Sequence, residues 1–347
     1  MLPYENYQAI GASVLAVTKQ DQINLAQHAV DPVTESSRVV LRLGTRGSPL
    51  ALIQTRIAQA LLKEAAPSIE TVIEVVQSLG DRVRDRPLAA LNAQGIFTQA
   101  IEEALRRGEV DVAVHSAKDL PSALPSDLVI ATVPERADPR DCLVSRDGLS
   151  LADLPRGATV GTGSPRRAAQ LRRLRPDLRF HPIRGNADTR RRAALEGRLD
   201  AVVLAAAGLD RLGLLDRHAI PLSVDVCLPQ AGQGALALEI RLTDSATAAI
   251  LDGINHKPSA ACLAAERAVL AHLRAGCQAP AAAFAMIRED GILFLRGSVV
   301  SLDGSAALDA SHSGPVDEAQ EIGAGVAERL RSKGADALLA EARGRER

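Results

Sequence analysis

One short pattern occurs twice in this chain, and it limits the folds that the chain can adopt. In each copy an apolar run is followed by a Gly-Thr pair, expected to form a turn, and then by Ser-Pro. Serine is a preferred helix N-cap, and proline fits the first helical position because its missing N–H would be unpaired there. Alternating strands and helices follow each copy, which predicts two similarly built α/β lobes, although Ser-Pro alone is also a common helix start. The copies are Gly44, Thr45, Ser48 and Pro49, and Gly161, Thr162, Ser164 and Pro165.

The second copy opens a basic stretch, residues 158–192, in a chain whose formal net charge is −1. Arg166 and Arg167 fall in its first predicted helical turn. Unpaired backbone N–H groups and the positive end of the helix dipole lie there too, so a carboxylate or phosphate would meet several donors together. Asn186 is a plausible cap for a further helix at 187–195. The stretch therefore predicts an anion-binding wall.

Composition excludes several classes of protein. The chain is 46% hydrophobic and 24% charged, as expected of a globular protein. Aromatic residues make up 2% and tryptophan is absent, which argues against stacking platforms for single-stranded nucleic acid. The four cysteines form no CxxC pair and the histidines no HxxxH pair, so we expect neither a disulfide framework nor a metal site. No apolar run is long enough to span a membrane.

The order of predicted elements gives the domain plan. Residues 1–37 are expected to be a partly disordered extension and not a signal peptide, with the cytoplasm as the default compartment. One α/β domain is predicted at 38–134 and 235–253, and a second at 140–228. Two crossovers, near 134–140 and 229–234, would join them as hinged lobes with the site between. Residues 256–347 are expected to form a small α+β domain.

Lys118 and Asp119 follow shortly after the carboxyl end of the predicted strand at 110–115. In open α/β sheets the carboxyl ends of strands face the ligand crevice, so both side chains are candidates for a site. The alternative is that Asp119 only caps a turn. In the third domain, Gly276 is expected to stop a helix and leave Cys277 in the following loop. The alternative for Cys277 is a buried, inert thiol.

Nine collinear segments carry a resemblance to a known family, and together they cover about residues 41–339. They read GTRGSPLAL, GDRVRDRPLA, DVAVHSAKDLPS, ERADPRD, GTGSPRRAAQLRRLRPDL, IRGNADTR, AAAGLDRLGL, PQAGQGALALEIR and AERAVLAHLRAGCQAP. The chain resembles the porphobilinogen deaminases, also called hydroxymethylbilane synthases. The resemblance implies two doubly wound lobes like those of periplasmic binding proteins, plus a small C-terminal α+β domain. It also implies a cytoplasmic monomer.

The family joins four porphobilinogen molecules head to tail and releases ammonia at each step, and hydrolysis then frees hydroxymethylbilane. A dipyrromethane cofactor is held by a thioether, and the matching cysteine is Cys277. Asp119 matches the catalytic acid. Matching cofactor-binding residues are Lys118, Thr162, Ser164, Arg166, Arg167 and Arg184, and substrate-binding residues are Arg46, Ser48, Arg190, Arg211 and Gln233.

This resemblance divides the arginines of the basic stretch. Pyrrole units carry an acetate and a propionate each, and buried carboxylates need fixed cations. We therefore expect Arg166, Arg167, Arg184 and Arg190 to face the cleft. The remaining arginines are expected to be solvated surface: Arg172, Arg173, Arg175, Arg179, Arg191 and Arg192.

One segment departs from the family. Where the family usually reads KGLFxKE, this chain has glutamine at Gln94 and Gln99 in place of two lysines. The loss of charge indicates either weaker binding offset by other arginines or a paralogue with an altered substrate or product. A non-catalytic anion-binding or sensor protein on the same fold is a further alternative. A nucleic-acid-binding role rests only on the basic stretch.

Overall fold

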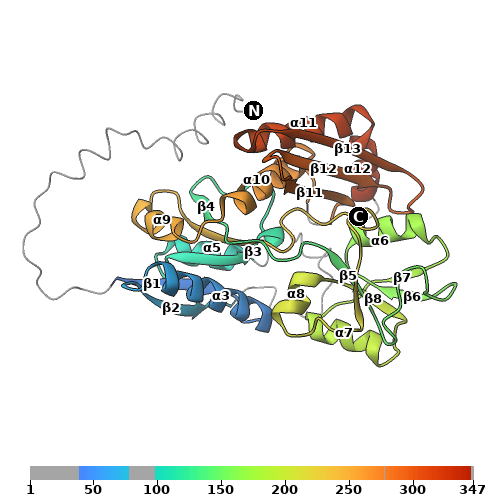
Figure 1. Cartoon of the computed structure of the whole chain (residues 1–347), viewed down its shortest axis with the longest axis horizontal. Coiled ribbons are helices and arrows are strands. Elements are labelled where there is room, and N and C mark those ends of the chain that lie inside the picture. Colours follow the sequence, from blue (N-terminus) through green and yellow to red (C-terminus); the bar gives the residue numbers. More distant parts are fainter. Residues whose placement is uncertain (1–38, 78–97, 277, 345–347) are drawn as a thin grey trace, which may run out of the picture. The chain divides into compact units, whose positions relative to one another are not determined.

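The computed structural model describes residues 39–77, 98–276 and 278–344 (Figure 1). Their strands form two five-stranded sheets and one three-stranded sheet. Residues 78–97, the predicted extension at 1–37 and Cys277 lie outside the described residues. No helix in the described ranges combines the length and the apolar character that crossing a membrane requires.

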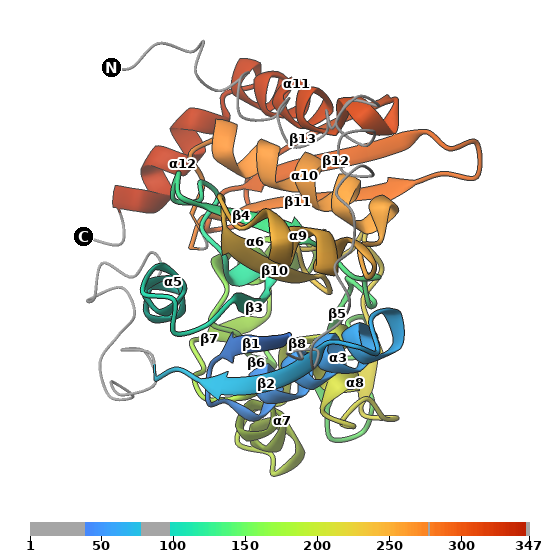
Figure 2. The same cartoon turned by 90° about the vertical axis from the view of Figure 1, so that its left-hand side faces the viewer.

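The first sheet has the strand order β2-β1-β3-β10-β4. β1 runs parallel to β2 and β3, whereas β10 is antiparallel to both of its neighbours. Side chains alternate between the faces, so α3 packs against Val112 and Val114, and α5 packs against Ala113 on the opposite face (Figure 2). The elements are β1 (Val40–Thr45), α3 (Pro49–Ala65), β2 (Glu70–Val75), α5 (Gln99–Arg106), β3 (Val112–Ser116), β4 (Leu128–Thr132), β10 (Leu236–Arg241) and α9 (Ser245–Asp252).

The second sheet repeats this plan with the order β7-β6-β8-β5-β9. β6 is parallel to β7 and β8, and β5 is the antiparallel strand, in the place that β10 takes in the first sheet. Each sheet thus contains one strand, β10 or β5, that the chain reaches directly from the other lobe. The elements are β5 (Asp141–Ser145), β6 (Thr159–Gly161), α6 (Pro165–Leu174), β7 (Arg179–His181), α7 (Ala187–Leu195), β8 (Ala201–Ala205), α8 (Ala206–Arg211) and β9 (Ala219–Pro221).

The matching sheet orders confirm the prediction of two similarly built α/β lobes. Both predicted helix starts are also confirmed: Ser48 Oγ accepts a bond from the Ala51 N–H at 3.2 Å, and Ser164 Oγ accepts one from the Arg167 N–H at 3.4 Å. Asn186 caps α7 as expected, with its Oδ1 2.8 Å from the Thr189 nitrogen. The exact domain boundaries stay a prediction.

The role predicted for the repeated glycine was wrong. Gly44 and Gly161 belong to β1 and β6 and do not form turns. A Cβ on Gly44 would lie 2.9 Å from Val110 Cγ2, and one on Gly161 would lie 2.6 Å from Leu199 Cδ1. Both contacts come from the residue two positions before the neighbouring strand, β3 or β8. The two glycines therefore serve the same close approach in both lobes.

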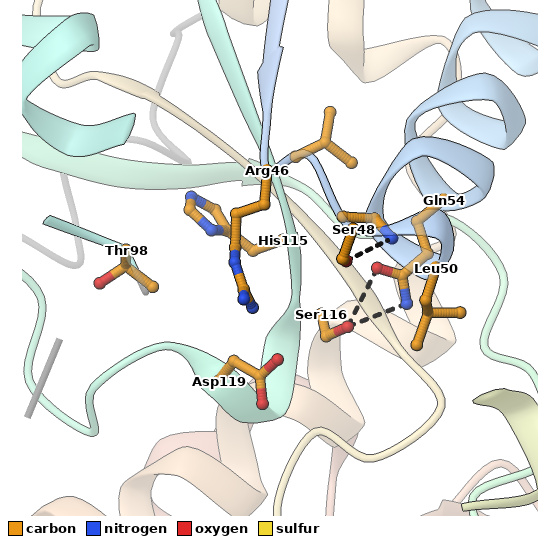
Figure 3. Close-up of a pocket in the computed structure, with 10 residues that line it drawn as sticks. Arg46, Ser48, Leu50, Gln54, Thr98, His115, Ser116 and Asp119 are labelled. Carbon is orange, nitrogen blue, oxygen red and sulfur yellow. Dashed lines mark hydrogen bonds between the residues drawn. The ribbon is translucent and has the colours of Figure 1, made fainter. Parts of the chain in front are cut away.

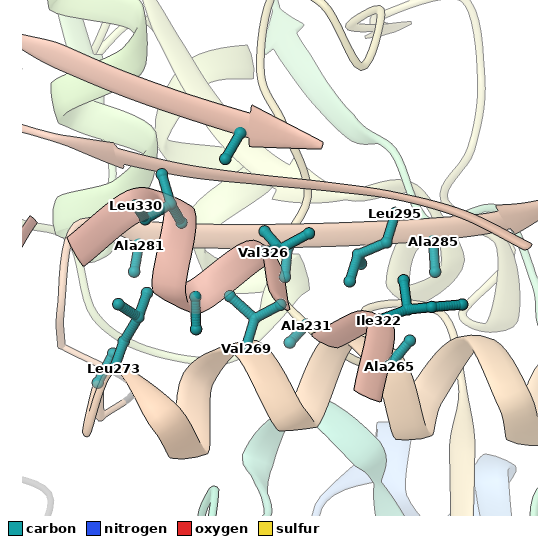
Figure 4. Packing of buried hydrophobic residues seen from close by; sticks show 14 of the residues in the cluster. Ala231, Ala265, Val269, Leu273, Ala281, Ala285, Leu295, Ile322, Val326 and Leu330 are labelled. Atoms are coloured by element: carbon teal, nitrogen blue, oxygen red, sulfur yellow. The ribbon is translucent and has the colours of Figure 1, made fainter. Parts of the chain in front are cut away.

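The third sheet is the antiparallel order β11-β12-β13, with α10 and α11 packed on it around one hydrophobic cluster (Figure 4). Gly323 lets the two helices meet closely, since a Cβ there would lie 2.4 Å from the Ala265 carbonyl oxygen. The elements are α10 (Lys257–His272), β11 (Ala281–Ile287), β12 (Leu293–Val300), β13 (Ala307–Gly314), α11 (Ala319–Ser332) and α12 (Ala335–Gly344).

The end of α10 also differs from the prediction. The helix stops at His272, and the left-handed residue beyond it is Arg274, with φ +50°, not Gly276. The Ala275 N–H then bonds the Leu270 carbonyl oxygen at 2.9 Å, the long bond of a Schellman motif. The chain therefore leaves the helix earlier than the glycine indicated, and Gly276 already belongs to the following loop.

Candidate active site

Asp119 lies in the short 3₁₀ turn, Ala117–Asp119, at the carboxyl end of β3. Its side chain is exposed and lines a pocket at this edge of the first sheet (Figure 3). The N-terminal turn of α3 and the N-cap residue of α5, Thr98, border the same pocket. In Figure 3 the side chains of Arg46 and Asp119 point into the same space. The lining residues are Arg46, Ser48, Leu50, Ala51, Gln54, Thr98, Val114, His115, Ser116 and Asp119.

The turn that carries Lys118 and Asp119 is held by the return crossover. The Ala117 N–H bonds the Ala235 carbonyl oxygen at 3.0 Å, and Gln230 Nε2 bonds the Lys118 carbonyl oxygen at 3.2 Å. Gly232 has φ +74°, and a Cβ there would lie 3.0 Å from the Lys118 nitrogen. The glycine-rich crossover therefore fixes the backbone beneath the predicted catalytic acid.

Cations gather around Asp119. Burial lowers the pKa of Lys118 to about 8, and the positive charge of Arg167 lowers it as well, whereas Asp119 and Asp141 raise it. Burial lowers the pKa of Arg190 to about 10, with Arg167 acting in the same direction and Asp119 opposing it. Lys118 and Arg190 thus both lie within electrostatic reach of Asp119 and of Arg167, although they come from different lobes.

Arg166 and Arg167 do not face an open cleft as expected. They are 2% and 7% exposed and both bind the buried carboxylate of Asp141, at 2.8 and 2.6 Å. Arg166 also donates to the Leu228 carbonyl oxygen at 2.6 Å, and Arg167 to that of Val203 at 3.0 Å. Burial alone would raise the pKa of Asp141, but the two guanidinium groups hold it well below its usual range. The expected orientation was wrong because the sequence does not reveal this partner.

Gln233 is fully buried and joins the two lobes. Its Nε2 donates to Asp141 Oδ1 at 2.8 Å and to the Pro139 carbonyl oxygen at 2.7 Å. Its Oε1 accepts from Lys118 Nζ and from Arg167 Nη2, each at 3.3 Å. Both the oxygen and the NH₂ of the Gln233 amide bond other groups of the protein. Gln233 therefore belongs to the frame of the site, by which we mean the buried residues around Asp141 that connect the two lobes. The predicted contact of Gln233 with substrate stays a prediction.

The remaining predicted residues surround this frame. Thr162 is buried, and its Oγ1 accepts from the Ser164 N–H at 3.2 Å. Arg211 donates to the Gly234 carbonyl oxygen at 2.8 Å, and burial lowers its pKa. Arg184 is exposed, in the segment between β7 and α7. Cys277 lies outside the described residues, so the structure does not place the predicted attachment point.

Three of the arginines expected to be solvated surface have structural partners instead. Arg175 pairs with Asp177 at 2.8 Å, and Arg191 pairs with Asp216. Arg172 bonds the carbonyl oxygen of Leu302 in the third domain and lies over the ring of Phe180. The prediction of an exposed surface holds for the other three: Arg173, Arg179 and Arg192.

The sequence analysis missed a second buried carboxylate, Glu266 on α10. It accepts from Arg136 Nη1 at 2.6 Å, from the Gly232 N–H at 2.7 Å and from the Ala285 N–H at 2.8 Å. Glu266 therefore binds both crossovers and β11 at one point. The sequence did offer a hint of this pair. Glu266 and Arg136 both lie in segments that resemble the family, yet neither matches a ligand-binding residue, which indicates a structural role.

Comparison with known proteins decides the family. A family model described as porphobilinogen deaminase, dipyromethane cofactor binding domain, matches residues 41–249, and the porphobilinogen deaminase C-terminal domain matches residues 260–332. The chain belongs to the porphobilinogen deaminase family. A porphobilinogen deaminase of Geobacter sulfurreducens is 45% identical over 306 residues, 88% of this chain and 96% of that protein. One from Thermobifida fusca is 47% identical over 310 residues, 87% and 96% of the two chains.

Solved structures add a distant likeness. The periplasmic aliphatic sulphonate binding protein SsuA of Escherichia coli is 18% identical, with a TM-score of 0.36 over 68% of this chain and 70% of that chain. This score is too low to carry an argument. The two-lobed α/β assignment of this porphobilinogen deaminase family member therefore rests on the sheet orders described above.

The described residues fit the dipyrromethane cofactor for which the family's first domain is named. That group carries carboxylates, and the surroundings of Asp119 hold more positive than negative charge. The depressed pKa values of Lys118 and Arg190 record mutual repulsion among cations, beyond the effect of burial. A bound polycarboxylate would relieve this repulsion. Groups of three or more residues able to hold a metal ion do not occur in the described part of the chain.

Proposed function

We propose that this chain condenses four porphobilinogen molecules head to tail, with release of ammonia, to give hydroxymethylbilane in tetrapyrrole biosynthesis. The observation that carries the proposal is Asp119, an exposed carboxylate that lines a pocket together with Arg46 and acts electrostatically on Lys118 of the same lobe and Arg190 of the other. Substrate cations and substrate carboxylates need opposite charges close together, and this pocket provides both.

We also propose a cytoplasmic monomer, for which sedimentation at assay concentrations would give the mass of one chain.

The cofactor, when bound at Cys277, would supply the free pyrrole carbon to which the first substrate is joined. Lys118 and Arg184 would hold its carboxylates, as the resemblance predicts. Arg46, Arg190 and Arg211 would hold those of the incoming porphobilinogen. Thr162, Ser164, Arg166, Arg167 and Gln233 would act mainly by fixing the lobes and the helix start, in keeping with their bonds inside the protein.

Asp119 would stabilise positive charge. When the aminomethyl C–N bond breaks, ammonia takes the electron pair and the substrate becomes an electron-poor cation. A carboxylate already in place beside it lowers the energy of this species without reorganising solvent, which is the strongest form of electrostatic catalysis.

The test of this role is Asp119→Ala. We expect ammonia release to fall by about 10²–10³-fold or more, the typical loss when a preorganised charge is removed. Since Asp119 is exposed at the end of a strand, the melting temperature should change little. Asp147→Ala, at another exposed acid of the second lobe, serves as the control. Turnover near the wild-type rate in Asp119→Ala would refute the assignment.

A diverged paralogue is the second candidate, and the glutamines at Gln94 and Gln99 are the observation behind it. Gln99 begins α5, directly after the pocket residue Thr98, whereas Gln94 lies outside the described residues. If the glutamines only weaken binding, replacing both by lysine should lower KM and leave the product unchanged. A different product from the doubly substituted enzyme would favour the paralogue.

A further inference from the structure

A buried polar cluster lies directly behind the Asp119 pocket. His115, Glu239 and Glu102 are 5%, 0% and 4% exposed. They sit on the α5 face of the first sheet, between two hydrophobic clusters, one around Ala113 and the other around Ala237. Nothing in the function proposed above uses these side chains.

The strand register brings the histidine and one carboxylate together. His115 of β3 is opposite Ala237 of β10, and Glu239 is two residues further along β10 on the same face. Diagonal neighbours of an antiparallel pair are within reach of long side chains. The ring Nε2 of His115 lies 3.2 Å from Glu239 Oε2. An ionised carboxylate can only accept, so Nε2 donates and the Nδ1 of a neutral ring carries the lone pair.

This ring borders the catalytic pocket. His115 lines it together with Asp119, four residues later in the chain (Figure 3). Nδ1 has no hydrogen bond to any residue in the described ranges. Glu239 thus holds one side of a ring that lines the pocket. This is the arrangement in which a carboxylate orients a histidine base.

The cluster is costly for stability. Glu102 Oε1 and Glu239 Oε1 are buried without a partner within the described part of the chain. Burial raises the pKa of Glu102, and the charge of Glu239 acts in the same direction. Apolar residues would fill this space at a lower cost, so a buried ionisable group beside a pocket indicates function. The charged groups around His115 are Glu239 from β10, Glu102 from α5, and Arg46 and Asp119 at the pocket. Arg106 of α5 acts on Glu102, and Arg267 of α10 interacts with Glu239.

The proposed reaction needs such a base. After each new C–C bond, the attacking pyrrole carbon must lose its proton to restore the aromatic ring. If Asp119 took this proton, it would lose the charge that stabilises the next cation. We propose that His115 is the proton acceptor and that Glu239 positions its ring and stabilises the imidazolium. The C–H bond breaks, its electron pair returns to the pyrrole ring, and the proton moves to His115 Nδ1 and then to the released ammonia.

This inference rests on the proposed function, and its test separates the two. Wild-type holoenzyme, His115→Asn and Glu239→Gln would be assayed with porphobilinogen and with porphobilinogen deuterated at its free α carbon. If the wild-type enzyme releases no ammonia, the proposed function fails. If it is active, we expect His115→Asn to lower kcat by about 10²–10⁴-fold, the usual contribution of a general base. The deuterium isotope effect should also increase, because proton removal becomes slow.

Glu239→Gln keeps the volume of the side chain and removes its charge. We expect kcat to fall and the acidic limb of the pH–rate profile to move to lower pH, because the imidazolium loses its counter-charge. Independently of activity, ¹⁵N NMR of the ring should show Nε2 protonated in the wild type and the other tautomer favoured in Glu239→Gln. A ring that is unchanged in this variant contradicts the positioning role.

Two further measurements distinguish chemistry from folding. Added imidazole should partly restore kcat in His115→Ala, which a purely structural role would not permit. His272→Asn is the matched control, because that ring bonds the Ala268 carbonyl oxygen of its own helix, and we expect this variant to leave kcat unchanged. Wild-type kcat and an unaltered isotope effect in His115→Asn would overturn the proposal, as would an inactive His115→Ala that imidazole does not rescue.

Discussion

At the scale of single residues, Asp141 explains why the basic stretch can exist in a folded protein. Two buried guanidinium groups and one buried carboxylate share hydrogen bonds with Gln233 and with Cys227 Sγ at 3.4 Å. Removing one partner of a buried ion pair leaves an uncompensated charge, which is far more damaging than losing an exposed pair.

Asp141→Asn should therefore lower the free energy of unfolding by about 3–5 kcal/mol, measured by urea denaturation. Because the folded-state pKa of Asp141 is below its usual range, the stability that this carboxylate contributes is present above about pH 4 and is lost as the pH falls further. The free energies of unfolding of the wild type and of Asp141→Asn should therefore converge as the pH falls below about 4. Asp225→Asn, which removes an exposed partner of Arg296, is the control and should lose much less. Equal losses in both variants would contradict a central role for Asp141.

Lys118 gives a second residue-scale prediction. In Cys277→Ala, which cannot hold the cofactor by a thioether, Lys118 should react with an amine-acylating reagent with a midpoint near pH 8, the value to which burial lowers its pKa. In the loaded wild type, cofactor carboxylates should stabilise the ammonium and move the midpoint to higher pH. Lys257, exposed at the start of α10, is the internal reference. The same midpoint in both proteins would argue against contact between Lys118 and the cofactor.

At the scale of elements, the sequence predicted correctly the features that depend on residues close together in the chain. Ser48, Ser164 and Asn186 cap the predicted helices because capping depends only on neighbouring residues. Three strands lack such a signal: β7 and β9 have three residues each, and β13 is rich in small polar residues and half exposed. Pairing with a neighbour, not intrinsic preference, makes these segments strands.

The candidate site shows the same division. The sequence located Asp119 and Arg46, which line one pocket, because strand ends and family-like segments are local features. It did not reveal that Arg166 and Arg167 turn inward, since Asp141 is 25 residues earlier and nothing in a charge count pairs them. Glu266 and the His115–Glu239 pair were missed for the same reason, because their partners are 19 to 130 residues away.

Glu266 provides the element-scale prediction. In Glu266→Gln, the amide NH₂ would face one of the three N–H donors whose hydrogen bonds the carboxylate now accepts. These donors belong to Arg136, Gly232 and Ala285. Glu266→Gln should therefore lower the free energy of unfolding by about 3–5 kcal/mol and loosen both crossovers. Hydrogen exchange should increase at the Gly232 and Ala285 amides. Glu103→Gln, on the exposed face of α5, should leave exchange at both amides unchanged. Full protection of these amides in Glu266→Gln would show that the crossovers are held elsewhere.

At the scale of the whole molecule, the proposed reaction would use residues from three parts of the chain. The first lobe carries Asp119 at a strand end, the second presents Arg190 and the frame around Asp141, and the C-terminal part carries Cys277 beyond α10. Glu266 and Arg267, adjacent on α10, bind the crossovers and the loop after Asp119. This arrangement explains why a two-lobed anion-binding fold would need a third domain: the substrate chain is tethered while it grows.

The central claim is that this chain is a condensing enzyme primed by a cofactor on Cys277, and mass spectrometry of the denatured protein tests it most directly. The account predicts that the wild-type chain, purified from cells that make porphobilinogen, is heavier by two porphobilinogen units less two ammonia molecules. Peptide mapping should place this addition on Cys277, and Cys277→Ala should have its unmodified mass. A wild-type chain with no dipyrrole adduct, or with the adduct on another residue, would contradict the account.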